Sequence, residues 1–557
     1  MTRFPICTSV AICIYLLLFT HDISGQNKID SLSLKMNAIF KQYNQKTGPG
    51  CAVAVVRNGV AIFEKGYGMA NLEYDIPITP ATVFDIASVS KQFTGMAISS
   101  LIQQGKISLD DDIRKYLPDV PEFGKTITIR HLVHHTSGLR DWPEALSMAG
   151  WRWDEVYSFD DIMRLVKNQK ELDFEPGEKY SYSNTGYNLL AAIVEKVSGK
   201  SFREWTEENI FKPLKMNSSQ FQDDYTRIIK NLAYSYNPGN NGFSKIPGAL
   251  TAYGSSSLFT TVQDLSKWVI YFDKQIALKN PVYLNMLTEG KLNNGEPVHY
   301  GYGLGTGESH KLKTISHTGG WAGYRTIIIN YPDEKLSIII LSNVSDFNIG
   351  RFSSEIADVF LKNKYKKEEK IADKVKNAPT IKMDSTLAKK YAGTYQLAPG
   401  WLVTLTWEES MLMIQATGES KFMTDAKSDS TIWIDAYGAS ITFVKDKNGD
   451  VNLLKYKNIQ AKRVTPVLPA VPADLKDYIG TYYSGELAAE YKIDLSNGIL
   501  KVHHMRLGDI NLNPVTVEID QFDGDIGNLR FMRNENKKVT GFKLSGGRVK
   551  NISFDKR

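Results

Sequence analysis

A repeat in the C-terminal part of the chain constrains its fold more than any other feature. The stretch Tyr391–Tyr395 recurs as Tyr478–Tyr482, and strand-like residues that follow each copy recur at the same offset of 87 to 88 positions. These matched residues are Leu412 and Leu500, Ile414 and Val502, Phe443 and Phe531, and Val451 and Val539. A constant offset between matched strands indicates two copies of one antiparallel β module, each near the size of a small closed barrel. We expect these barrels at 386–467 and 468–557.

The part of the chain before residue 361 has a different character, because helical periodicity alternates there with strand-like runs. Asn58-Gly59 lies between two such runs and predicts a β-hairpin. Thr326–Ile329 reads as a buried strand that pairs with Ser337–Leu341. The lysine-rich stretch 362–385 separates the two parts and is predicted to be a solvated linker.

The N-terminus predicts export. Arg3 precedes an apolar run, Val10–Phe19, which is too short to span a bilayer comfortably, and Ile23-Ser24-Gly25 offers a small residue for cleavage. We expect a signal peptide at 1–25 and a periplasmic or secreted protein without stable membrane insertion; an uncleaved N-terminal anchor is the alternative. Cleavage leaves Cys51 as the remaining cysteine, so we expect it in the core rather than in an intramolecular disulfide.

Ser88-Val89-Ser90-Lys91 is the first candidate catalytic motif. It precedes a segment whose apolar residues recur every three or four positions, which places Ser88 near the start of a buried helix. Lys91 then lies one turn further along the same face, beside the serine hydroxyl. A desolvated lysine can lose its proton and serve as a base, and a helix N-terminus favours a developing oxyanion. A polar helix start is the alternative for this motif alone.

Tyr182-Ser183-Asn184 is the second candidate motif. It follows a turn at Phe174–Glu178 and precedes an apolar helix that Gly199 ends. Tyr182 can relay a proton, and Asn184 offers an amide donor and a carbonyl acceptor to a substrate. A helix cap with a packed tyrosine is the alternative.

His317-Thr318-Gly319-Gly320 is the third candidate motif, and it leads directly into the strand at Thr326–Ile329. Paired glycines allow the backbone to approach a ligand closely. A literal Lys46-Thr47-Gly48 also occurs, but it precedes Ser88 and lies in a turn before the first strand. The order of the three motifs, rather than any one of them, predicts a serine acyl-transfer enzyme.

With these motifs in this order, the chain resembles the serine β-lactamase and penicillin-binding protein superfamily, in its class C-like branch, over about residues 28–361. The resemblance implies an α/β catalytic domain at 26–361, in which an antiparallel sheet of five or more strands is flanked by helices. It also implies site roles: Ser88 as nucleophile, Lys91 as its activator, Tyr182 as general acid and base, and Asn184 as a substrate ligand. The N–H groups of Ser88 and Gly320 would form the oxyanion hole beside Gly319.

His317 departs from the commonest family pattern, which has lysine at this position. Lysine presents a permanent cation to a substrate carboxylate, whereas histidine with an ordinary pKa is mostly neutral at pH 7. The departure favours the D-aminopeptidases and esterase-like members of the superfamily, which are similar in having His-x-Gly here. The two C-terminal modules are similar to the lipocalin-like barrels attached to some of these enzymes. We expect Trp401, Trp407 and Trp433 to pack inside the barrels.

The remaining features exclude other classes of function. The formal net charge of +6 is small for 557 residues, so no nucleic-acid partner is expected. No zinc motif or dinucleotide fingerprint stands out, so neither a metal nor a cofactor is expected. We expect an exported hydrolase of short peptides or D-amino-acid amides. An esterase, a β-lactamase or D,D-carboxypeptidase, and a non-catalytic sensor with the same fold remain alternatives.

Overall fold

The computed structural model describes residues 31–366, 371–398, 401–417, 419–457, 459–466, 474–515 and 517–557. By its internal contacts the chain divides into two compact units. The first comprises residues up to Leu139 with 153–164 and 174–366, and the second comprises 140–152, 165–173 and 367–557. The expected signal peptide lies outside the described residues. Within those residues, no helix has the length and apolarity needed to cross a membrane.

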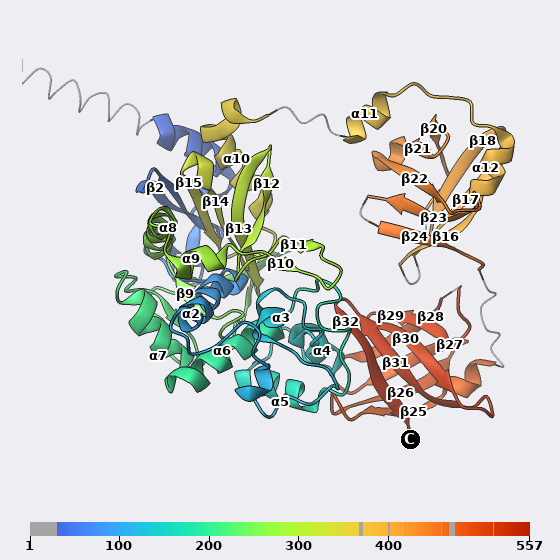
Figure 1. Cartoon of the computed structure of the whole chain (residues 1–557), viewed down its shortest axis with the longest axis horizontal. Helices are drawn as coiled ribbons and strands as arrows, with labels where there is room; N and C mark the ends of the chain where they lie inside the picture. The colour runs from blue at the N-terminus through green and yellow to red at the C-terminus, as the bar shows by residue number, and fades with distance from the viewer. Residues whose placement is uncertain are drawn as a thin grey trace, which may run out of the picture. The chain divides into compact units, whose positions relative to one another are not determined.

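The first unit is built on a six-stranded antiparallel sheet in the order β12-β13-β14-β15-β1-β2 (Figure 1). Its strands are β1 (Cys51–Arg57), β2 (Val60–Tyr67), β12 (Gly305–Ser309), β13 (Leu312–Trp321), β14 (Tyr324–Tyr331) and β15 (Leu336–Ser342). Asn58 and Gly59 have φ values of 52° and 76°, the left-handed conformation that a two-residue hairpin turn requires, so the predicted hairpin forms. The predicted pairing of β14 with β15 is also present, with Ile327 opposite Ile340.

Helices pack on both faces of this sheet. The helices of the first unit are a segment at 31–39, α2 (Lys91–Gln103), α3 (Ile129–Val133), α6 (Asn184–Ser198), α7 (Phe202–Thr206), α8 (Val262–Ala277), α9 (Pro281–Met286) and α10 (Ile349–Leu361). Helix α10 packs on β14 and β15, and α8 packs on β1 and β15. Because strand side chains alternate between faces and every residue of β15 is buried, both faces are covered. Cys51 is a fully buried free thiol in this core, as predicted.

Short elements complete the first unit and carry much of its loop structure. Single turns are η1 (Lys41–Tyr43), η2 (Ala87–Ser90), η3 (Ile113–Lys115), η4 (Glu207–Phe211), η5 (Pro332–Glu334) and η6 (Lys362–Lys364). Short strands are β3 (Met69–Asn71), β4 (Ile76–Pro77), β5 (Phe84–Asp85), β6 (Gln220–Phe221), β7 (Ser235–Gly239), β8 (Gly242–Ile246), β9 (Leu258–Thr260), β10 (Gly290–Lys291) and β11 (Pro297–Val298). Among them, β5 pairs with β9 and thereby holds the chain just before Ser88.

The first β module is a nine-stranded antiparallel sheet in the order β19-β18-β17-β16-β24-β23-β22-β21-β20. It consists of β16 (Gly393–Ala398), β17 (Trp401–Glu408), β18 (Met411–Ala416), β19 (Phe422–Met423), β20 (Asp425–Ser428), β21 (Thr431–Ile434), β22 (Ala439–Lys445), β23 (Val451–Tyr456) and β24 (Ile459–Val464), with the turn η7 (Asp435–Tyr437). Helices α11 (Ile371–Asn377) and α12 (Ser385–Tyr391) precede it, so parts of the predicted linker 362–385 are helical.

The second β module is a closed barrel of strands β25 to β32, preceded by the turn η8 (Asp474–Tyr478). Its strands are β25 (Gly480–Ser484), β26 (Ala489–Ser496), β27 (Ile499–His504), β28 (Gly508–Pro514), β29 (Gln521–Gly524), β30 (Gly527–Arg533), β31 (Val539–Gly546) and β32 (Val549–Lys556). The repeat seen in the sequence is structural: the hydroxyl of Tyr395 donates to the carbonyl of Tyr391, and that of Tyr482 donates to the carbonyl of Tyr478.

Two segments from the N-terminal part of the sequence fold with the second barrel, which the sequence did not predict. Residues 140–152, with α4 (Trp142–Met148), and residues 165–173, at the end of α5 (Phe159–Asn168), belong to the second unit. Within that unit, the buried guanidinium of Arg140 donates to the carboxylates of Asp173, at 2.5 Å, and Glu486. Because all three side chains are at most 3% exposed, this ion-pair network is a buried tie between distant parts of the sequence.

Candidate active site

Ser88 lies in the turn η2, between β5 and α2, at the position where the sequence predicts a helix start. The turn is tight: Ala87 has a φ of 47°, an unusual value for a residue with a Cβ, and its N–H donates to Asp85 Oδ1 at 2.8 Å. The regular α-helix begins at Lys91, three residues after the serine. Ser88 is half-buried while Val89 and Ser90 on its C-terminal side are buried, so the turn presents this serine at its surface.

Lys91 connects two of the three motifs through its ammonium group. Its side chain is fully buried, and Nζ donates to Ser88 Oγ at 3.2 Å, to Asn184 Oδ1 at 2.8 Å and to the carbonyl oxygen of Ser255 at 2.7 Å. All three acceptors are neutral oxygens. Nζ also lies 4.8 Å from the centre of the Tyr182 ring. The structure therefore brings Ser88, Lys91, Tyr182 and Asn184 together, as the order of the motifs predicts.

Tyr182 and Asn184 lie at the N-terminus of α6, where the sequence places them. The hydroxyl of Ser183 caps the helix by accepting the N–H of Gly186 at 3.2 Å, and the N–H of Ser183 donates to His135 Nδ1 at 3.1 Å. The His135 ring packs against the Tyr182 ring, with centroids 4.3 Å apart. His135 thus fixes both the backbone and the ring of this motif.

His317 lies on β13 with its imidazole pointing into the site, 6.1 Å from the Tyr182 ring between centroids. Its Nδ1 is 2.7 Å from the carbonyl oxygen of Thr318 and its Nε2 is 2.9 Å from the hydroxyl of Tyr300. A carbonyl oxygen only accepts, so Nδ1 carries the proton and Nε2 accepts the hydroxyl hydrogen of Tyr300. Burial, and next the charge of Lys91, lower the pKa of His317 to about 3, so its imidazole is neutral at pH 7.

The two glycines after His317 differ in what surrounds them. A Cβ at Gly319 would lie 2.2 Å from the carbonyl oxygen of Ile86 and 2.3 Å from Thr326 Oγ1, whereas at Gly320 the nearest atom would be 3.7 Å away. Gly319 is therefore required by the close approach of β13 to the Ser88 turn. Gly320 carries no such steric demand, and its predicted role rests on its N–H.

Three residues around the site were missed by sequence reasoning. Asp85 is almost fully buried, and burial raises the pKa of its carboxyl to about 7, opposed by the N–H of Ala87. His135 and Tyr300 pack around Tyr182, with their own ring centroids 4.6 Å apart. The sequence could have indicated two of them only by their position: Asp85 precedes the Ser88 motif, and Tyr300 precedes a glycine-rich turn. In the described part of the chain, no group of His, Cys, Asp and Glu side chains is arranged to hold a metal ion.

An aromatic cluster lies at the end of β13, directly after Gly320. Trp321 is 5.5 Å from Trp153 and 5.6 Å from Tyr157 between ring centroids, both in edge-to-face geometry. Trp153 is 57% exposed, although tryptophan side chains are mostly buried in folded proteins. The cluster offers a partly exposed apolar surface on the strand that carries the third motif.

Comparison with known proteins agrees with this geometry. The family model described as Beta-lactamase matches residues 36–353. Penicillin-binding protein 4* of Bacillus subtilis (strain 168) is 30% identical over 412 residues, covering 69% of this chain and 87% of that protein. A D-aminopeptidase of Gluconobacter oxydans (strain 621H) is 28% identical over 316 residues, covering 56% of this chain and 59% of that protein. The octameric penicillin-binding protein homologue from Pyrococcus abyssi shares the fold, with a TM-score of 0.53 and 24% identity over 78% of this chain and 99% of that one.

Proposed function

The chain belongs to the beta-lactamase family of serine hydrolases, and from that premise we propose that it is an exported enzyme acting on short peptides and D-amino-acid amides. Its C-terminal modules distinguish it from a bare catalytic domain. The proposal concerns the substrate and the residue roles, because the family itself establishes hydrolysis through an acyl-enzyme.

In the proposed reaction, Lys91 acts as the neutral amine: it donates to Asn184 Oδ1 and to the carbonyl oxygen of Ser255, and its lone pair faces Ser88 Oγ, 3.2 Å away. Ser88 Oγ attacks the carbonyl carbon of the amide as Lys91 accepts the hydroxyl proton. The N–H groups of Ser88 and Gly320 stabilise the oxyanion. Tyr182 delivers its phenolic proton to the leaving nitrogen as the C–N bond breaks, and Lys91 passes the serine proton on to Tyr182. Water then attacks the Ser88 ester; Lys91 takes one proton from this water and passes it to Ser88 Oγ as the acid is released. The observation that carries this scheme is the position of Lys91 Nζ, 3.2 Å from Ser88 Oγ and 2.8 Å from Asn184 Oδ1.

The neutral state of His317 supports the choice of substrate. A substrate whose recognition depends on a terminal carboxylate needs a cation, and an imidazole with a pKa of about 3 does not supply one at pH 7. An amide or a free N-terminus makes no such demand. The D-aminopeptidase of Gluconobacter oxydans, although matched over only 59% of its length, supports the same direction. The partly exposed Trp153 suits an apolar substrate side chain.

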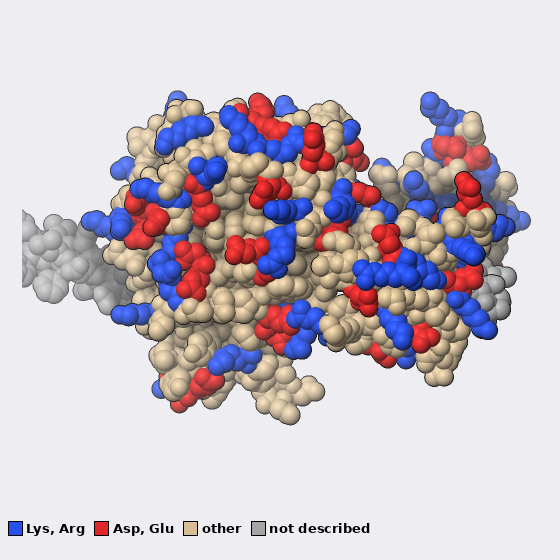
Figure 2. Space-filling model, turned by 90° about the horizontal axis from the view of Figure 1, so that it is seen from below, with Lys and Arg blue, Asp and Glu red and all other residues tan. Residues whose placement is uncertain are grey.

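A small substrate also suits the charge distribution. Basic and acidic side chains are interspersed over the face drawn in Figure 2, rather than gathered into the basic stripe that a nucleic acid requires. A periplasmic or secreted location follows from the sequence alone, through the expected signal peptide at 1–25. Mass spectrometry of the N-terminus after expression in a bacterial host tests that part of the proposal.

Labelling with a fluorophosphonate probe, followed by intact-protein mass spectrometry, tests the nucleophile. We expect one adduct on the wild type, none on Ser88→Ala, and one on Ser90→Ala, the matched serine in the same turn. Initial rates on paired D- and L-amino-acid p-nitroanilides then test the substrate. Turnover of β-lactams or simple esters alone would overturn the substrate assignment while leaving the nucleophile in place.

A further inference from the structure

The first β module contains a cavity with a volume of about 90 Å³. Its inner wall is apolar: Val403, Ile414, Ile441 and Leu454 line it, and each of them is at most 4% exposed. Protein interiors are close-packed and leave few voids larger than a water molecule. A cavity of this size in the middle of a small β module therefore needs an explanation in the sequence.

The strand pairing of the two modules supplies part of that explanation. Tyr395 and Tyr482 are equivalent, since both belong to the repeated motif and both donate to a tyrosine carbonyl four residues earlier. Tyr395 lies opposite Val403, whereas Tyr482 lies opposite Tyr491. A valine in the first module thus takes the place of a tyrosine in the second.

At two further positions the first module again has a smaller side chain than the second: Leu454 corresponds to Phe542, and Ala461 corresponds to Phe554. In the first module Phe443 pairs with Leu454, and Leu454 pairs with Ala461. In the second, Phe531 pairs with Phe542, and Phe542 pairs with Phe554.

In the second module these larger residues pack against one another. The rings of Tyr491 and Phe542 lie 4.5 Å and 4.7 Å from that of Phe554 between centroids. At two of these three positions the first module has Val403 and Leu454, and both side chains line the cavity.

The mouth of the cavity is polar and aromatic. Trp401 lines it and is 39% exposed, and the exposed Glu419 accepts a hydrogen bond from the hydroxyl of Tyr437 at 2.5 Å. The Tyr437 and Tyr456 rings meet edge to face, with centroids 6.4 Å apart. A carboxylate beside aromatic faces attracts an organic cation, because the ring quadrupole and the negative charge act in the same direction.

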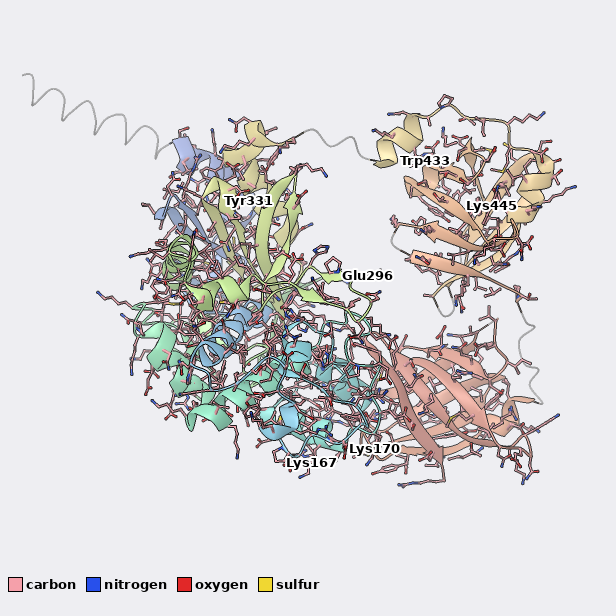
Figure 3. All side chains as sticks on the ribbon, viewed as in Figure 1. Lys167, Lys170, Glu296, Tyr331, Trp433 and Lys445 are labelled. Carbon is pink, nitrogen blue, oxygen red and sulfur yellow. The ribbon has the colours of Figure 1, made fainter. Side chains whose placement is uncertain are left out.

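Trp401 differs from the other tryptophans that were expected to pack. Trp433, labelled in Figure 3, is 3% exposed and its indole nitrogen donates to Asp435 Oδ1 at 2.7 Å. Trp407 is partly buried against the core of the module. The packing expectation is therefore correct for Trp433 and Trp407, and wrong for Trp401, whose side chain lies at the mouth.

We propose that this cavity is a binding site for a small organic amine, separate from the Ser88 site. The apolar part of the ligand is a short alkyl chain, smaller than a benzene ring, and it enters between Val403 and Leu454. The ammonium remains at the mouth, next to Glu419 and the rings of Trp401 and Tyr437. The size limit follows because this cavity of about 90 Å³ is smaller than the apolar cavity of about 150 Å³ that holds one benzene molecule.

Fluorine NMR on the full-length protein tests the proposal, with 3,3,3-trifluoropropylamine as the probe. We expect saturable binding to the wild type, at least tenfold weaker binding to Val403→Tyr, and an unchanged or higher melting temperature in that variant. Val403→Tyr introduces the residue that the second module has at the equivalent position, so it fills the cavity with a side chain the module type accommodates.

A second pair of variants and a neutral probe keep the test decisive if Val403→Tyr does not fold. Glu419→Gln should weaken binding of the amine about tenfold and leave binding of 3,3,3-trifluoropropan-1-ol unchanged. Glu409→Gln, another exposed glutamate of the same module, is the matched control and should change neither. The proposal is overturned if the amine shows no saturable binding. It is also overturned if the amine binds wild type and Glu419→Gln equally, because the probe then binds at another site, such as that of Ser88.

Discussion

Gly319 and Ile86, 233 positions apart in the chain, approach each other so closely that a Cβ on the glycine would lie 2.2 Å from the carbonyl oxygen of Ile86. The same carbonyl accepts a hydrogen bond from Thr326 Oγ1 at 2.8 Å. These contacts set the distance between the strand that carries His317 and the turn that carries Ser88. The relative position of the first and third motifs is therefore determined by backbone contact.

Gly319→Ala tests this contact. The added Cβ meets backbone rather than a movable side chain, so the strand has to shift. We expect the free energy of unfolding to fall by about 1–3 kcal/mol. We also expect the variant to lose most of its activity. Urea unfolding and fluorophosphonate labelling measure the two effects. Gly320→Ala is the matched variant for stability and should unfold at the wild-type urea concentration. Equal destabilisation by both substitutions would contradict the steric account.

Lys91→Met removes the ammonium while keeping a similar apolar length. We expect kcat/KM to fall by a factor of about 10²–10⁴, the usual contribution of a positioned acid or base. The variant also removes the donor to Asn184 and Ser255, so its melting temperature has to be measured alongside the rates. Lys106→Met, an exposed lysine just beyond α2, serves as the control. A fall in rate of less than tenfold in a folded Lys91→Met protein would exclude Lys91 as the principal base.

The pH dependence of the rate reports on His317. Burial lowers the pKa of His317 to about 3, so this group does not titrate between pH 5 and 8. We therefore expect the pH–rate profiles of wild type and His317→Gln to rise and fall at the same pH values in this range, even if the maximal rates differ. A limb near pH 6 to 7 that disappears in His317→Gln would show instead that this imidazole titrates during catalysis.

His317 also affects stability in acid. The folded chain keeps the imidazole neutral while the unfolded chain protonates it below about 6.5, so stability is lost as pH falls from about 6.5 towards 3. This residue contributes at most about 1.4 kcal/mol per pH unit to the slope of the free energy of unfolding against pH. Thermal unfolding between pH 4 and 7 should show a shallower slope for His317→Gln than for the wild type. Parallel curves would contradict the lowered pKa.

The Asp85 carboxyl affects stability with the opposite pH dependence, which Asp85→Asn tests. The pKa of the Asp85 carboxyl is raised by burial from 3.8 to about 7, so the folded chain holds a proton that the unfolded chain releases above pH 4. Wild-type stability from this group is therefore present at low pH and lost as pH rises towards 7. We expect Asp85→Asn to become increasingly stable relative to wild type between pH 4 and 8. Asp525→Asn, the same substitution at an exposed carboxyl, is the matched control.

Glu486→Ala tests the buried tie in the second unit. The substitution removes the Glu486 carboxylate from the buried guanidinium of Arg140, and we expect a loss of about 3–5 kcal/mol in the free energy of unfolding. Glu490→Ala, an exposed glutamate four residues later, should cost less than about 1 kcal/mol. Similar urea midpoints for the two variants would show that the network contributes little.

Local sequence signals predicted much of the fold and of the candidate site. Asn58-Gly59 gave the hairpin because its turn needs positive φ values, and the spacing of Ser88 and Lys91 gave their contact because the chain turns helically there. Ser183 caps α6, so the sequence also placed Tyr182 and Asn184 at a helix start. Each of these features depends on neighbours within a few residues.

The parts that escaped prediction depend on contacts between distant residues. Nothing beside His135 in the sequence indicates that its ring packs on Tyr182, and nothing beside Arg140 indicates a carboxylate 346 positions later. The cavity of the first module was hidden for the same reason. Val403, Leu454 and Ala461 are ordinary strand residues until their partners in the ladder are known.

The tie between Arg140 and Glu486 has a consequence for the order in which the chain folds. A chain that is delivered from its N-terminus, by the ribosome or across a membrane, generally folds its domains in that order. Here residues 140–152 reach their native packing only after the second barrel has been made as far as β32. The carboxylate of Glu486, in the turn after β25, and the carbonyl of Lys550, on β32, complete the surroundings of Arg140. A nascent chain that has already produced all three motifs therefore still holds an unfinished segment directly after Leu139.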